Sequence, residues 1–134
     1  MNTRMNEVVG EEIRENLFNQ TYPSADVFTV LLRAGQGVLA RGALLAKSSS
    51  IGDFVIIGTP AASGETLTAN CILADDADTG TAAGAALSAV AYRTGHFNGN
   101  KLAVNPGYTI TDADKETLRT LGILLSDAAE YKEV

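Results

Sequence analysis

The sequence predicts a mainly β fold of the α+β type, with one short helix near the C-terminus and an extended N-terminal arm. Residues 25–110 alternate short apolar runs with glycine-containing turns, a pattern typical of strands. One later segment carries the start and stop signals of a helix. The first 23 residues are instead polar and charged. We therefore divide the 134 residues into an arm at 1–24 and a β-rich domain at 25–134.

The arm has a weak helical pattern. Its residues Met5, Val9, Ile13 and Leu17 recur at intervals of four, as on one face of a helix, although Gly10 interrupts them. An isolated helix this short is marginal in water. We therefore expect the arm to become ordered on a partner surface, through its apolar and aromatic side chains. These are Val8, Val9, Ile13, Leu17, Phe18 and Tyr22.

Apolar stretches rich in β-branched residues predict the strands of the domain. Glycines and prolines separate these stretches, which favours turns between them. Arg41-Gly42 interrupts one stretch and predicts a bulge or bend there. The expected strands are residues 26–33, 38–46, 54–57, 66–74, 85–97 and 123–125.

Asn98-Gly99 is the strongest hairpin signal in the chain, because both residue types tolerate a positive φ. It predicts that residues 101–104 pair back on the strand at 85–97. Asn105-Pro106-Gly107 predicts the next turn.

The helix is expected at residues 112–121. Thr111 followed by Asp114 resembles a capping box, in which two side chains bond the first backbone amides of a helix. Gly122 fits the left-handed position that ends a helix. Leu118 and Leu121 form the apolar stripe.

Composition argues against several classes of partner. The net charge is −6 and the ten lysines and arginines are dispersed, so we expect no binding to nucleic acid or to an anionic membrane. No apolar run approaches the ~20 residues that span a bilayer, and the charged first 20 residues do not resemble a secretory signal. With no tryptophan and few aromatics, the chain has few anchors for a small-molecule substrate.

The reactive side chains lack the partners that catalysis or metal binding requires. His96 is the only histidine and Cys71 the only cysteine, and no motif places a nucleophile or an orienting acid beside either. The two together cannot complete a zinc site. We expect His96 to be a polar residue near a turn and Cys71 to be a buried apolar residue, so no catalytic or metal-binding residue is predicted.

The densest acidic cluster is Asp75, Asp76 and Asp78. A calcium loop needs a glutamate at its twelfth position. Counting from Asp75 or Asp76, that position holds Ala86 or Leu87. We therefore interpret these aspartates as turn formers.

Three stretches, taken in order, resemble the head decoration family of tailed bacteriophages, typified by phage lambda. They are GVLARGALLA at 37–46, CILADDAD at 71–78 and VAYRTGHFN at 90–98, the last followed by the helix and LRTLGI at 118–123. The resemblance covers residues 26–126. A common variant of the third stretch has glutamate in place of His96, so the histidine is not required.

The resemblance implies a compact, barrel-like or tulip-like domain that assembles as a homotrimer on the outer surface of the expanded capsid. The trimers would clamp neighbouring major capsid protein subunits against the pressure of packaged DNA. It implies a structural virion protein, made in the host cytoplasm, with no enzymatic activity and no cofactor. An arm would reach onto the capsid. No family motif maps onto residues 1–23, so the contacts of the arm are inferred from its own residues.

Three other functions remain as alternatives. The first is another structural virion component, such as a minor tail or fibre-base protein, which would occur in few copies per virion. The second is a small β-domain enzyme that uses His96 and an acid. The third is a cofactor carrier that uses Lys115, although carrier lysines lie at hairpin tips and this one falls in the predicted helix.

Overall fold

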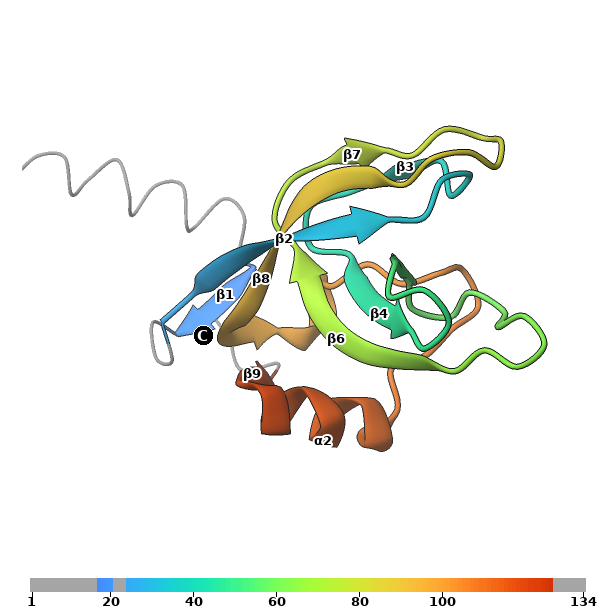
Figure 1. The fold of residues 1–134 in the computed structure, drawn as a ribbon. Coiled ribbons are helices and arrows are strands. Elements are labelled where there is room, and N and C mark those ends of the chain that lie inside the picture. Colours follow the sequence, from blue (N-terminus) through green and yellow to red (C-terminus); the bar gives the residue numbers. More distant parts are fainter. Residues whose placement is uncertain (1–16, 21–23, 127–134) are drawn as a thin grey trace, which may run out of the picture.

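A computed structural model describes residues 17–20 and 24–126, which form strands with one α-helix and one 3₁₀ turn (Figure 1). This confirms the mainly β class with a short helix near the C-terminus. The elements are β1 Phe18–Gln20, β2 Asp26–Leu32, β3 Val38–Leu39, β4 Leu44–Ser48, β5 Phe54–Ile56, β6 Leu67–Leu73, β7 Ala77–Asp78, β8 Leu87–Asn98, η1 Gly99–Lys101, α2 Asp112–Leu121 and β9 Ile123–Ser126.

Five of the strands close into a barrel in the order β2, β8, β6, β4 and β5. The pair that closes the ring is parallel and joins Leu32 of β2 to Phe54 of β5. Strand β8 is the longest, at 12 residues, and pairs with β2 from Leu87 to Thr94 and with β6 at Ala91 and Tyr92. Beyond the barrel, its last residues pair with β1 on one side and β9 on the other.

The apolar side chains gather in two clusters, on the two sides of the barrel wall. The barrel core fills the ring itself and consists of Val30, Leu32, Leu39, Ala43, Leu45, Phe54, Cys71, Leu73 and Ala91. The flank core lies between the wall and β1, α2 and β9, and consists of Leu17, Leu44, Ala46, Val55, Ile57, Ala69, Ile72, Phe97, Leu118 and Ile123.

Strand β4 separates the two cores and is buried on both faces. Leu45 points into the barrel core, whereas Leu44 and Ala46 point into the flank core. All three are inaccessible to solvent. A strand covered on both sides reads as a continuous apolar run rather than an alternating one, which explains the GALLA sequence here.

The helix at 112–121 forms as predicted. The Thr111 side chain accepts a hydrogen bond from the Asp114 amide, and the Asp114 carboxylate accepts one from the Thr111 amide. Gly122 ends the helix with a φ of 105°. Leu118 is fully buried, but Leu121, the second member of the predicted stripe, is 46% exposed.

The predicted hairpin at Asn98-Gly99 is wrong. Asn98 keeps an extended conformation, with a φ of −83°, and its side chain caps the 3₁₀ turn η1. Residues 101–104 cannot pair back on β8, because β1 and β9 already flank the end of that strand. Ala103 instead makes an isolated parallel bridge with Ala43.

Near the cluster of Asp75, Asp76 and Asp78, two structural features were predicted from the sequence and a third was not. The break at Arg41-Gly42 separates β3 from β4 as expected. The Asp78 carboxylate accepts a hydrogen bond from the Gly80 amide, which is the turn-forming role expected of it. Strand β7, which pairs with β3 as a separate two-stranded ribbon, was not predicted.

Candidate functional site

The first and the last strand of the described domain, β1 and β9, lie on either side of the end of β8. Strand β1 runs antiparallel to β8 and β9 runs parallel to it, so both meet the last residues of β8 from opposite sides (Figure 1). The Asn98 amide donates a 2.7 Å hydrogen bond to the Leu17 carbonyl, and Ser126 lies beside Asn98 in the register of β9. We call this place, defined by Leu17, Asn98 and Ser126, the exit end.

The structure places two of the six predicted capsid-binding residues inside the domain. Leu17 is 4% exposed in the flank core, and Phe18 packs against the same cluster. Sequence analysis assigned these side chains to a partner surface, but they find an apolar surface in their own domain. Strand β1 thus belongs to the fold, although it falls inside the segment assigned to the arm. The other four residues, Val8, Val9, Ile13 and Tyr22, lie outside the described part of the chain.

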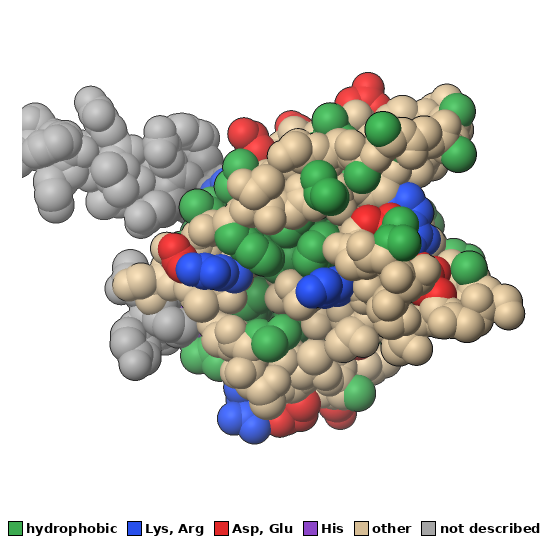
Figure 2. All heavy atoms as spheres, in the orientation of Figure 1, with side chains coloured by type: hydrophobic (Ala, Val, Ile, Leu, Met, Phe, Trp, Pro, Cys, Tyr) green, Lys and Arg blue, Asp and Glu red, His purple; other side chains and the backbone are tan. Residues whose placement is uncertain are grey.

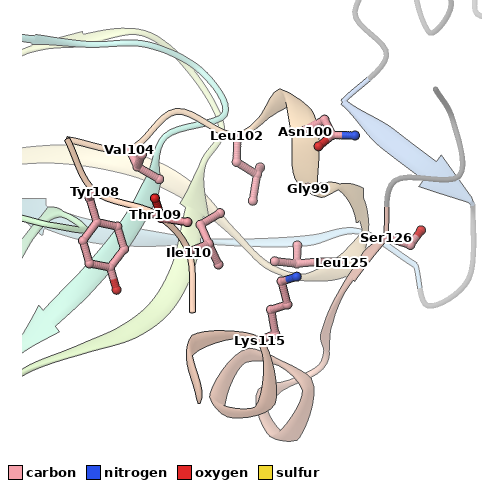
Figure 3. Close-up of a pocket in the computed structure, with 10 residues that line it drawn as sticks. All are labelled: Gly99, Asn100, Leu102, Val104, Tyr108, Thr109, Ile110, Lys115, Leu125 and Ser126. Atoms are coloured by element: carbon pink, nitrogen blue, oxygen red, sulfur yellow. The ribbon is translucent and has the colours of Figure 1, made fainter. Parts of the chain in front are cut away.

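A groove of about 350 Å³ opens next to the exit end, between η1, the following loop and α2 (Figure 3). Its lining is mixed: the apolar side chains of Leu102, Val104, Ile110 and Leu125 alternate with polar groups, among them Asn100, Thr109, Lys115 and Ser126. The Lys115 side chain extends from the first turn of α2 toward Leu125 at the rim (Figure 3). Lys115 therefore lies on a capped helix and not at the hairpin tip that a carrier lysine needs.

The other side chains singled out in the sequence do not come together in one site. His96 Nε2 lies 3.1 Å from Ser126 Oγ, beside the exit end. Cys71 is buried in the barrel core, where desolvation raises the pKa of its thiol to about 12. Over residues 17–20 and 24–126, no group of three or more histidine, cysteine, aspartate or glutamate side chains is arranged to hold a metal ion.

A partly buried ionic network lies beside the β2–β5 pair that closes the barrel, which we call the barrel seam. Arg33, just after β2, donates from Nε to Asp53 at 2.8 Å and from Nη2 to Glu65 at 2.5 Å. Ser48 donates to the same Glu65 carboxylate. The hydrogen bond from Arg33 is the main reason that the pKa of Glu65 falls to about 2. Sequence analysis missed this network, because the residues that bond to each other in it are 17 to 32 positions apart in the chain.

An apolar strip lies on the outward face of β2 and β8. Val27 and Leu31 of β2 are 48% and 52% exposed, and Val90 of β8, opposite Thr29, is 44% exposed. Figure 2 shows hydrophobic side chains near the centre of this face, where Figure 1 draws β2 beside β8, and basic side chains close by. We call Val27, Thr29, Leu31 and Val90 the β2–β8 strip. Exposed apolar clusters of this kind mark surfaces that bind other proteins.

Comparison with protein-family models identifies the family of this chain. The model of bacteriophage lambda head decoration protein D matches residues 12–124. The chain belongs to this family. The match includes the whole barrel and α2, and it begins within the arm, upstream of the residues 26–126 over which the resemblance was apparent. No curated protein matches the chain.

Membership in this family indicates where the chain is located and what kind of structure it binds. Head decoration proteins are structural proteins of the phage head, so this chain is a structural component that binds the capsid of the virion. Among the described helices, none is long and apolar enough to cross a membrane.

Proposed function

We propose that this protein, made in the host cytoplasm, binds the outer surface of the expanded phage head as homotrimers and stabilises the head against the pressure of packaged DNA. Its partner is the major capsid protein, and it acts by binding, with no catalytic step. The exit end carries this proposal, because an arm that starts at an anchored β1 leaves the domain from a fixed point.

The arm makes the capsid contacts through Val8, Val9, Ile13 and Tyr22, while Leu17 and Phe18 hold its root. Burying one such side chain contributes roughly 1.5–3 kcal/mol. Ordering the arm costs about 1–2 kcal/mol per residue, so one arm gains little on its own. Three arms on one trimer bind together, and linkage raises the overall avidity by orders of magnitude. This is the physical reason for a trimer.

The β2–β8 strip supports contact between subunits. It holds no charged residue, and its exposed valines and leucine would lose their contact with water in an assembly. A ring of three copies requires each strip to meet a different surface of the next copy. Leu31→Asp should then weaken trimer formation on heads. Ile51→Asp, at a residue that is 77% exposed in the β4–β5 turn, is the matched control and should have no effect.

The proposal is tested with expanded heads of the cognate phage assembled without this protein. Purified protein is added, and bound copies are counted by quantitative mass spectrometry while head integrity is followed on heating. We expect saturation at three copies for each three-fold or quasi-three-fold position, and survival to a higher temperature. Binding of only a few copies per particle would indicate a tail or fibre-base component. Saturated heads that are no more heat-resistant than bare heads would refute stabilisation.

A further inference from the structure

Strand β1 is short, and the aromatic side chain of Phe18 packs it against the domain. It has three residues, and its register with β8 is irregular between Phe18 and Gln20. The Phe18 ring lies 4.7 Å from the Phe97 ring and 5.1 Å, edge to face, from the Tyr92 ring. Phe97 and Tyr92 are themselves 5.6 Å apart. Aromatic groups at these separations attract one another beyond their area of burial.

Gly95 makes room for this arrangement. It has a φ of 147°, and a Cβ built at this position would lie 2.7 Å from Cε1 of Phe97 and 3.4 Å from Cε1 of Phe18. Any larger residue would displace the Phe97 ring on which Phe18 rests. The Gly95 amide also donates to the Gly122 carbonyl at the end of α2, which fixes the backbone beneath the rings.

The third ring, that of Tyr92, is held in place by Arg41 and by the barrel strands. Arg41 Nη1 donates to the Tyr92 hydroxyl at 2.8 Å and to the Ala74 carbonyl at 2.7 Å. The Arg41 guanidinium also lies 5.4 Å from the centre of the Tyr92 ring. Tyr92 pairs with both β2 and β6, so the rings that receive Phe18 are part of the closed barrel.

We propose that Phe18, Phe97 and Tyr92, packed over Gly95, form a root clamp that positions the arm for binding to the capsid. The clamp rests on the proposed function, and Phe18 is its positioning residue. Undocking β1 would turn residues that are fixed on β8 into a flexible connection between the arm and the domain. A longer connection lowers the effective concentration of the arm at its site and adds residues that must be ordered on binding.

The first test separates the clamp from general stability. Phe18→Ala is compared with Val55→Ala, which truncates another residue of the flank core far from β1 in the sequence, at a temperature where both are folded. We expect Phe18→Ala to weaken binding to expanded heads about tenfold, which is ~1.4 kcal/mol, and Val55→Ala to leave it unchanged. Phe18→Tyr should restore most of the affinity. Equal losses in the two alanine variants, or none in Phe18→Ala, would overturn the clamp.

Hydrogen exchange reports directly whether β1 undocks. The Asn98 amide, which donates to the Leu17 carbonyl, should lose protection in Phe18→Ala. The Leu73 amide, which donates to Ala43 in the barrel, should keep its protection. Gly95→Ala is expected to act in the same direction, and if it does not fold, Phe18→Ala alone decides. Unchanged protection at Asn98 would contradict the proposal.

A chain without residues 2–16 distinguishes failure of the clamp from failure of the proposed function. If this deletion abolishes binding to heads while Phe18→Ala does not weaken it, the arm acts without the clamp and the inference is wrong. If the deletion leaves binding unchanged, the arm is not the capsid contact, and the part of the proposed function that assigns binding to the arm is wrong.

Discussion

The barrel core and the flank core differ in what they require from the ends of the chain. The barrel core is built entirely from side chains between Val30 and Ala91. The flank core takes Leu17 from one end and Leu118 and Ile123 from the other. The barrel can therefore close without either end, whereas the flank core is complete only when β1, α2 and β9 have docked. We therefore expect the barrel core to stay closed when the flank core opens locally, and the flank core to anchor the arm.

The same substitution in the two cores tests this division. Leu45→Ala in the barrel core should lower the free energy of unfolding by about 2–5 kcal/mol, because the ring cannot collapse around the cavity. Leu17→Ala removes the same atoms from the flank core but should cost less, since β1 can detach locally and limit the loss. Denaturant titration measures both.

Thiol labelling of Cys71 shows which core opens in each variant. The thiol is buried and its pKa is raised, so it reacts only when the barrel opens. Leu45→Ala should speed labelling and Leu17→Ala should leave it slow. Equal losses of stability and equal labelling rates would show that the two cores unfold as one unit.

Acid should open the barrel seam through Glu65. Its pKa is about 2 in the folded protein, against 4.5 for an ordinary glutamate, with the hydrogen bond from Arg33 as the main cause. A depressed folded pKa contributes stability above pH ~4.5 that is lost as the pH falls toward 2. The network adjoins the single register pair Leu32–Phe54 that closes the ring.

The melting temperature, followed from pH 6 to pH 2, should thus fall steeply in the native protein and less steeply in Glu65→Gln. The variant should also start from a lower melting temperature at pH 6, because it lacks the ion pair with Arg33. Parallel curves for the two proteins would mean that another carboxylate controls the response to acid.

The smallest effect is expected at His96, which lies at the exit end but contacts Ser126 through a single 3.1 Å interaction. His96→Ala should leave affinity for expanded heads within about tenfold, or ~1.4 kcal/mol. Quantitative head binding checks this. A larger loss would make His96 part of the capsid contact and weaken the assignment of that role to the arm.

Sequence patterns predicted the elements whose signals are local. The capping residues Thr111 and Asp114 and the terminating Gly122 lie within one helix, so its bounds followed directly. The root clamp could not be predicted, because Tyr92 and Phe97 lie more than 70 residues after Phe18 and meet it only once β1 has paired with β8.

The hairpin error has the same origin as the missed clamp. Asn98-Gly99 is a strong turn signal on its own, but tertiary pairing decided the outcome. Strands β1 and β9 occupy both sides of the end of β8, and no pattern around Asn98 reveals either neighbour. Contacts between distant segments thus set the geometry of the exit end.

Deletion of residues 2–16 tests the central claim most directly, because it removes the arm and leaves Leu17, Phe18 and the flank core in place. The measurement is the survival of expanded heads on heating and on addition of chelator, with the full chain or the shortened chain bound. We predict that the shortened chain unfolds at nearly the same temperature as the full chain but no longer protects heads. Equal protection by both chains would contradict the account and move the capsid contact to the barrel domain.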